Sequence, residues 1–385
     1  MIKKIKIYIT LAAVAFSSVS CLDKYPEDAI PEGDAIRTVE EANQAVIGIY
    51  AYMKNPNLYS GLLTLLPDLQ ADLAYAVEGY TNTYGNIWRW DILPTNTEVE
   101  AVYGTLNALI GKCNFLLERI AVLEQEVDDE DYEKLQQFKG EALFARALSY
   151  SDLIKMYCKA YDPATAADEL GVVLVSSYSN AGTLKRASLK DSYQFVLDDL
   201  AQSATCLKPD ENENDESYYD TPYFTIYAVN ALYARVYLNM QEWDKAIEYA
   251  SKVIDSRKFK LSSTTEMIDS ETSYYQYMWQ YDHSTETIWK VGFTTTSYGG
   301  SLGQIFFNYD FNSFKPDYVP AEWVLNLYAD TDLRATTFFQ SYRTGYEHGL
   351  QWPLLAKYFG NQEFYEQNIL HVTMPKVFRL SEQYL

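Results

Sequence analysis

Two short stretches of the chain place aromatic and polar side chains together in a pattern that could bind sugars. Flat aromatic faces pack against the C–H edges of a sugar ring, and nearby Asn, Gln, Asp or Arg side chains bind its hydroxyl groups. The stretches span residues 80–90 and 274–282, and a Gly-rich segment follows the second. The alternative is that these aromatic rings pack on the scaffold and contact no ligand. The candidate ligand-binding residues are Tyr80, Tyr84, Trp88, Trp90, Tyr277, Trp279, Tyr281 and Tyr298.

A competing pattern suggests catalysis. Gly299–Gly303 has the G-x-S-x-G form of a serine hydrolase, and Asp330 and His371 follow in hydrolase order. This motif needs a strand, a sharp turn and a helix in a parallel sheet, for which helical repeats leave no room. The histidines of the chain stand in no metal-ligand spacing, so no catalytic zinc is expected. We expect no enzyme and no cofactor, and we retain a secreted serine hydrolase as an alternative.

The elements that must position the aromatic stretches are predicted from residues 222–261. Ala231, Ala234 and Leu238 share an apolar stripe, and a second stripe begins at Trp243 and continues through Ile247. Small residues followed by an aromatic at the turn are typical of a tetratricopeptide repeat. Because one helical hairpin cannot bury both of its faces, further hairpins should stack on it.

Other segments repeat this pattern. Residues 142–147 resemble residues 231–236, helices are expected over 98–122, 130–157 and 189–207, and Thr38 with Glu41 can form a capping box before another helix. We predict a mainly α fold of tetratricopeptide-like helical repeats with an irregular loop-rich region that holds few short strands. The scaffold should span residues 38–261 and the loop-rich region residues 262–374. Residues 375–385 look like the start of a further repeat helix in a chain that is cut short.

The first residues have the features of a bacterial export signal. Lys3, Lys4 and Lys6 precede an apolar run that is too short to span a bilayer, and small residues lead to Cys21. Residues 1–21 therefore read as a lipoprotein signal peptide with lipidation at Cys21, although simple secretion with a structural Cys21 remains open. Residues 22–37 form an acidic tether.

The charge of the chain excludes one class of partner. The formal net charge is −22 at pH 7, and 15% of the residues are aromatic. Such an acidic surface repels nucleic acid and offers no basic patch for anionic lipid.

The order of motifs resembles the SusD/RagB family. The matching motifs are Cys21-Leu22-Asp23, EANQAVIGIYAYM, AVYGTLNALIGKCNFLLERI, GEALFARALSYSDLIKMY, RASLKDSYQFVLDDLAQSATCL, ARVYLNMQEWDKAIEYASKVI, ETIWKV and PKVFRLSEQYL. The resemblance implies a lipid-anchored protein on the outer face of the outer membrane. It also implies capture of an oligosaccharide or polysaccharide for a SusC-like TonB-dependent transporter. The alternative is a helical-repeat scaffold that binds other proteins.

Overall fold

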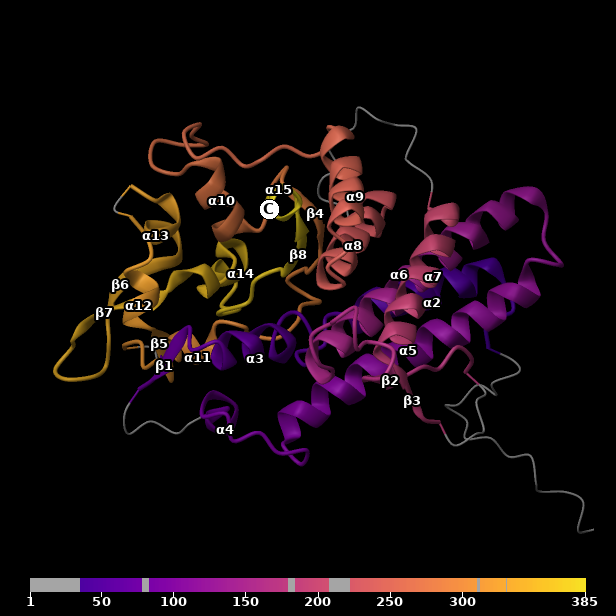
Figure 1. Cartoon of the computed structure of the whole chain (residues 1–385). Helices are drawn as coiled ribbons and strands as arrows, with labels where there is room; N and C mark the ends of the chain where they lie inside the picture. The colour runs from indigo at the N-terminus through magenta and orange to yellow at the C-terminus, as the bar shows by residue number, and fades with distance from the viewer. Residues whose placement is uncertain (1–34, 78–82, 179–183, 208–221, 310–311, 330) are drawn as a thin grey trace, which may run out of the picture.

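The computed structural model describes residues 35–77, 83–178, 184–207, 222–309, 312–329 and 331–385. Long helices fill one side of the molecule and a loop-rich region fills the other (Figure 1). The predicted mainly α architecture is confirmed. The scaffold helices are α2 (Val39–Tyr52), α5 (Thr97–Leu123), α6 (Asp129–Tyr157), α7 (Leu189–Cys206), α8 (Ile226–Asn239) and α9 (Trp243–Asp255).

Side-chain caps explain where several of these helices begin. Thr38 Oγ1 accepts a hydrogen bond from the Glu41 amide, and the Glu41 carboxylate accepts one from the Thr38 amide, so the predicted capping box is present. At the starts of α6, α7 and α8, the side chains of Asp128, Ser188 and Thr225 each accept a hydrogen bond from a backbone amide of the first turn. Each cap satisfies an amide that the first helical turn leaves without an intrahelical partner.

Helix α6 lies at the centre of the scaffold and is buried from Gly140 to Ile154 between α5, α7 and α2. Arg146 on α6 makes two hydrogen bonds to the Asp199 carboxylate on α7, at 2.8 and 2.7 Å, and a third to Asn114 on α5 at 2.7 Å. Gly140 lets α7 approach closely, since an added Cβ would lie 2.8 Å from Cys206 Cβ. Three helices are thereby fixed together by one buried polar cluster.

The α8–α9 hairpin is present and the second apolar stripe lies on α9, but part of that stripe is exposed. Trp243 is 56% exposed and Ile247 is 65% exposed, while Val253 is buried. One face of α9 packs on α8, and on the other face the short helix α15 (Leu380–Tyr384) covers only part of the stripe. The uncovered part forms a groove of about 420 Å³.

The loop-rich region is built from short elements over a second, smaller apolar core. Helix α3 (Leu62–Gln70) contributes Leu65 and Leu69 to this core, which also contains Phe306, Phe307 and Tyr318. The short helices of this half are α10 (Tyr274–Tyr281), α11 (Gln304–Phe307), α12 (Glu322–Leu325), α13 (Leu333–Phe338), the 3-10 turn η3 (Ala356–Tyr358) and α14 (Gln362–Glu366).

The strands of the described residues pair two by two, and every pair is antiparallel. Residues 376–379 were expected within a helix. They instead form a strand, because their backbone pairs with residues 287–290. The helix then begins at Leu380. The pairs are β1 (Ala74–Ala76) with β5 (Tyr318–Pro320), β2 (Leu170–Val173) with β3 (Arg186–Ser188), β4 (Thr287–Lys290) with β8 (Lys376–Arg379), and β6 (Phe339–Arg343) with β7 (Gln351–Leu355).

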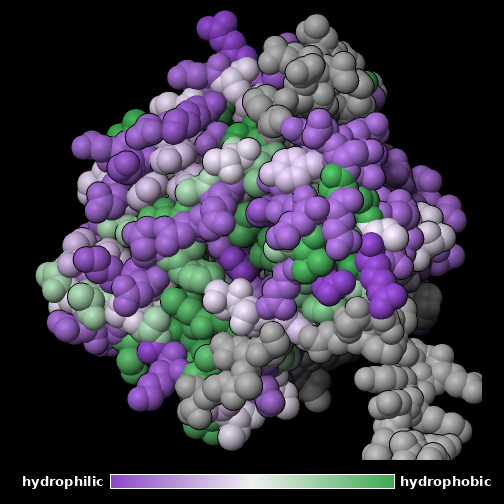
Figure 2. All heavy atoms as spheres, turned by 90° about the vertical axis from the view of Figure 1, so that its right-hand side faces the viewer, coloured by the Kyte–Doolittle hydropathy of each residue, from purple (hydrophilic) through white to green (hydrophobic). Residues whose placement is uncertain are grey.

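Seen from the scaffold side, the surface is mostly hydrophilic, with apolar side chains in patches between the polar ones (Figure 2). No helix within the described ranges is long and apolar enough to cross a membrane. The same part of the chain holds no group of three or more His, Cys, Asp or Glu residues arranged to bind a metal ion.

Candidate functional site

The predicted aromatic residues lie near two different pockets of the structure. Tyr84, Trp88 and Trp90 lie in or next to the short helix α4 (Gly85–Trp88), beside the β1–β5 pair. Tyr277, Trp279 and Tyr281 lie on α10. Tyr80 and Cys21 lie outside the described residues. Two short elements are therefore present here, since β1 precedes the first aromatic stretch and α4 lies within it.

The first hollow, which we call the Tyr84 pocket, has a volume of about 400 Å³. It forms where the start of α3, the segment before α4, helix α11 and the residue before β5 come together. Its polar and aromatic lining is brought from three distant parts of the sequence: Thr83, Tyr84, Ser301, Gln304, Asn308 and Asp317.

Asp317 is the acid of this pocket, and only 8% of its surface is exposed. Its Oδ2 accepts a hydrogen bond from Thr83 Oγ1 at 2.7 Å, whereas its buried Oδ1 has no hydrogen-bond partner. Burial raises the pKa of the carboxyl above its usual value, and the Thr83 hydroxyl partly offsets this. An unpaired buried acceptor costs on the order of 1–3 kcal/mol.

The backbone holds Asp317 in place. Its amide donates to the Ile305 carbonyl at 2.8 Å, and its carbonyl accepts from the Val77 amide at 2.9 Å. The next residue, Tyr318, donates its hydroxyl to the Thr83 carbonyl at 2.7 Å. These bonds tie the β1–β5 pair to α11 and to the segment before α4, so the carboxylate is positioned before any ligand arrives.

Tyr84 lies at the start of α4 in the left-handed backbone region, with φ of 62°. A non-glycine residue rarely adopts this conformation, and it is found most often where the surroundings require it. Burial raises the pKa of the phenol, and the charges of Glu98 and Asp317 raise it further. The hydroxyl therefore stays protonated at neutral pH and can donate to a ligand.

The two tryptophans near α4 have different environments. Trp88 is half-buried, its indole N–H donates to the Ala74 carbonyl at 2.8 Å, and its ring packs against Tyr318. Trp88 thus joins α4 to β1 and has no free N–H to offer a ligand. Trp90 is 64% exposed, and its backbone also has a positive φ, 60°.

On α10 the tryptophan ring is surrounded by cationic and aromatic side chains. Cationic groups of Lys357, Lys376 and Arg379 lie 5.4, 5.1 and 5.2 Å from the centre of the Trp279 ring, and Phe338 packs edge-on against it at 5.0 Å. Its buried indole nitrogen has no hydrogen-bond partner. Trp279 is enclosed by its neighbours, so its surroundings favour the packing alternative.

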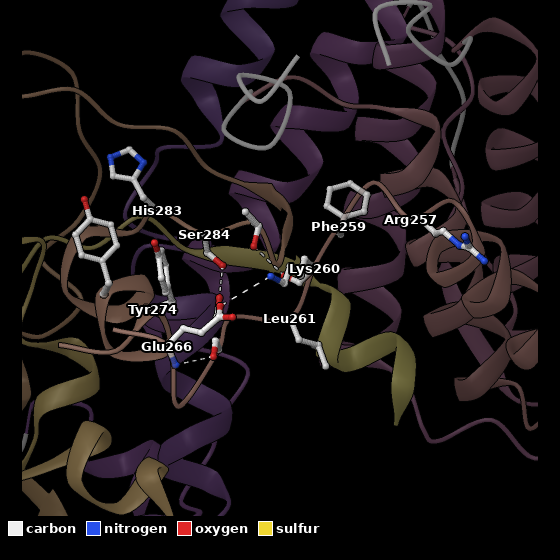
Figure 3. A pocket seen from close by; sticks show the side chains of 12 residues that line it. Arg257, Phe259, Lys260, Leu261, Glu266, Tyr274, His283 and Ser284 are labelled. Carbon is white, nitrogen blue, oxygen red and sulfur yellow. Dashed lines mark hydrogen bonds and ion pairs between the residues drawn. The ribbon is translucent and has the colours of Figure 1, made fainter. Parts of the chain in front are cut away.

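Tyr277 and Tyr281 stack on each other with ring centres 4.5 Å apart and planes at 22°. Tyr277 also lines the second hollow, which we call the Tyr274 pocket, of about 600 Å³ (Figure 3). Tyr298 is half-exposed beside Phe364 and immediately precedes the glycines that border the Tyr84 pocket.

Sequence reasoning missed Asp317 and Gln304 as candidate site residues. Asp317 stands alone before a three-residue strand, and Gln304 begins a four-residue helix. Neither has a spacing pattern that could have marked it, because the pocket is made by contacts between distant segments.

The hydrolase pattern does not assemble a catalytic centre. Ser301 is exposed at the Tyr84 pocket, whereas the His371 ring is buried, stacks on Phe307 and directs Nδ1 to the Phe359 carbonyl at 2.9 Å. Asp330 lies outside the described residues. The described strands form antiparallel pairs alone, so the parallel sheet that the motif requires is not found among them.

Comparison with known proteins agrees with this architecture. The chain matches the SusD-like family, described as starch-binding and associating with the outer membrane, over residues 22–238, more than half of its 385 residues. A curated relative, SusD-like protein P2 of Formosa agariphila, is 23% identical over 257 residues. The match covers 66% of this chain and 46% of that relative, so the chain spans about half the length of the relative.

Solved structures show the same fold. A SusD superfamily protein from Bacteroides thetaiotaomicron is 22% identical with a TM-score of 0.72, over 90% of this chain and 74% of that one. Surface glycan-binding protein A from Bacteroides uniformis is 16% identical with a TM-score of 0.68, over 90% and 74% of the two chains. The family match and the shared tetratricopeptide-like architecture lead to one conclusion: the chain belongs to the SusD-like family.

Proposed function

We propose that this protein captures an oligosaccharide or polysaccharide at the cell surface, with the Tyr84 pocket as its binding site, and that it catalyses no reaction. The observation that carries the proposal is the lining of the pocket, in which the Asp317 carboxylate lies with the Tyr84 ring and the polar side chains of Gln304 and Asn308. A carboxylate oxygen accepts a sugar hydroxyl, and an aromatic face packs on the ring carbons. The family description is likewise one of binding.

The size of the pocket limits what it holds. Small-molecule sites commonly enclose about 300–1,000 Å³, and the Tyr84 pocket, at about 400 Å³, lies near the lower end of that range. It can take one or two sugar rings, while the rest of a glycan lies on the surface outside. Trp90, exposed just beyond α4, would provide a flat face for such a ring.

The wider role follows from the family resemblance. Lipidation at Cys21 would anchor the protein to the outer membrane facing the cell exterior, with residues 22–37 as the tether. Captured glycan would pass to a SusC-like TonB-dependent transporter. Tethering both partners to one membrane raises their effective concentration, so modest affinity for the glycan suffices.

Calorimetric titration of the protein in detergent tests the binding step. The panel would contain maltoheptaose, cellohexaose, mannohexaose and xylohexaose, with product analysis of each mixture. We expect binding without release of shorter sugars. Trp90→Ala should weaken it about tenfold, which corresponds to about 1.4 kcal/mol. Trp243→Ala is the matched control, because Trp243 is similarly exposed but lies on α9.

The protein-binding scaffold is the second candidate, and the exposed apolar groove along α9 is the observation that favours it. Under that function, Trp243→Ala would abolish recovery of a protein partner and no glycan in the panel would bind. Release of shorter sugars that Ser301→Ala abolishes would instead support the hydrolase.

A further inference from the structure

The Tyr274 pocket lies between helix α10 and the segment that leaves α9, residues 257–263. Figure 3 shows side chains from both segments around the hollow, with Tyr274 and His283 at one end and Phe259 and Arg257 at the other. The two sides are joined by backbone hydrogen bonds, including one from the Tyr275 amide to the Ser263 carbonyl at 3.0 Å. The pocket is thus a fixed feature of the fold.

The aromatic walls of this pocket are rigidly supported. Tyr274 begins α10 directly after Ser273, whose side chain forms a capping box with Gln276, and 45% of its surface is exposed. Tyr277 is backed by the stacked ring of Tyr281. Phe259 is buried and packs edge-on against Tyr227 at 5.5 Å. An exposed ring at the rim with supported rings beside it suits packing against a sugar.

The charge of the pocket is opposite to that of the chain as a whole. Arg257 and Lys260 are both exposed and line it, against one carboxylate, Glu266. The Glu266 carboxylate lies 3.9 Å from the Lys260 ammonium, and both side chains are largely in solvent, so this ion pair is weak. At physiological salt, charges more than about 8 Å away are largely screened, so a ligand group in the pocket responds to these local cations.

We propose that the Tyr274 pocket is a second carbohydrate subsite, and that it takes a sugar ring bearing an anionic group, either a carboxylate or a sulfate ester. Tyr274 packs on the ring at one end of the pocket, Lys260 binds the anion of that ring, and Arg257 at the other end binds the anion of the next ring. The guanidinium of Arg257 can donate two parallel hydrogen bonds to a carboxylate or sulfate. This inference rests on the proposed capture of glycans and specifies one class of them.

The two pockets differ in the charge that they present to a glycan. The Tyr84 pocket presents the carboxylate of Asp317, which repels an anionic ring and accepts hydroxyl groups of a neutral one. The Tyr274 pocket presents two cations and attracts an anionic ring.

Titration with matched ligands tests the subsite. Hexagalacturonate and its methyl ester differ only in the charge of the carboxyl groups, and a sulfated galacto-oligosaccharide with its desulfated form tests the sulfate ester. We expect each anionic form to bind at least tenfold more tightly than its neutral form. Arg257→Gln with Lys260→Gln should remove that difference, and Tyr274→Ala should weaken the anionic forms further.

A second double variant controls for net charge. Lys159→Gln with Lys190→Gln also removes two positive charges, from the α6–β2 connection and from α7, and it should bind the anionic forms as the wild type does. Equal affinity for charged and neutral forms, or no anionic ligand bound at all, would overturn the subsite. So would full anion binding by the Arg257→Gln/Lys260→Gln protein. Because maltoheptaose and the other neutral sugars report on the Tyr84 pocket separately, failure of this inference is distinguishable from failure of the proposed function.

Discussion

The helical scaffold and the loop-rich region differ in how completely their buried polar groups are hydrogen-bonded. In the scaffold, Arg146, Asp199 and Asn114 form a closed cluster in which the guanidinium makes three hydrogen bonds. Among the described residues, the buried side-chain atoms without partners lie almost entirely beyond residue 262, and Asn239 Nδ2 is the one in the scaffold. The first region is organised for stability. The second retains unpaired groups such as Asp317 Oδ1.

The largest effect on stability is expected when the buried polar cluster of the scaffold loses its arginine. Arg146→Met leaves the buried Asp199 carboxylate without its partner, which should lower the free energy of unfolding by about 3–5 kcal/mol. Urea unfolding monitored by circular dichroism measures this. Adding Asp199→Leu to the same protein should recover much of the loss, because the isolated charge is then gone. A single variant as stable as the wild type would show that the cluster does not hold the three helices together.

A smaller effect is expected at His371 in the loop-rich core. Burial lowers the pKa of this imidazole below its usual value of 6.5, although the hydrogen bond with the Phe359 carbonyl opposes the shift. The unfolded chain therefore binds a proton more readily than the folded one. His371 contributes stability above about pH 6.5 that is lost as the pH falls toward the lowered pKa.

His371→Asn should reduce the loss of stability between pH 7 and pH 5. Asparagine tolerates the positive φ of 61° at this position and can still donate to the Phe359 carbonyl. Urea unfolding at the two pH values provides the comparison. His348→Asn is the control, since His348 is exposed and also has a positive φ, 60°. An unchanged pH dependence in the His371 variant would contradict the interpretation.

The smallest effect on stability is expected at the capping box that begins α2. Thr38→Ala removes the side-chain half of the capping box at α2 and should cost about 1 kcal/mol. Glu242→Ala serves as its pair, because Glu242 occupies the same position before α9 without making a side-chain cap. Thermal unfolding of the two proteins should therefore show a clear decrease for the first and little change for the second.

The two regions also differed in how far the sequence predicted them. Apolar periodicity and caps located the scaffold helices to within a residue or two, as for residues 98–122 and α5, because local pattern decides a long amphipathic helix. The exposed faces of Trp243 and Ile247 could not be foreseen, since the stripe specifies that a face is apolar but not what covers it. In the loop-rich region, tertiary pairing overrode helical pattern at residues 376–379.

The candidate site was predicted less completely than the scaffold, because contacts between distant segments assemble it. Crowded aromatics pointed to two segments that contribute to pockets, and Tyr84 and Tyr277 line them. The same signal also selected Trp88 and Trp279, which pack against neighbouring groups, because composition does not reveal which face of a ring is covered. Asp317 acquires its role only through Thr83, far away in the sequence.

Asp317→Asn provides the most direct test of the central claim, that the Tyr84 pocket binds a glycan through the Asp317 carboxylate. The buried carboxylate destabilises the free protein, so its neutral replacement should leave the free energy of unfolding at pH 7 unchanged or raise it by about 1 kcal/mol. The stabilisation should disappear at low pH, because the raised pKa means that the wild-type carboxyl becomes neutral there. Calorimetry with the tightest-binding neutral oligosaccharide should show affinity reduced about tenfold. Glycan binding that remains unchanged, or a loss of stability in place of the gain, would contradict the account.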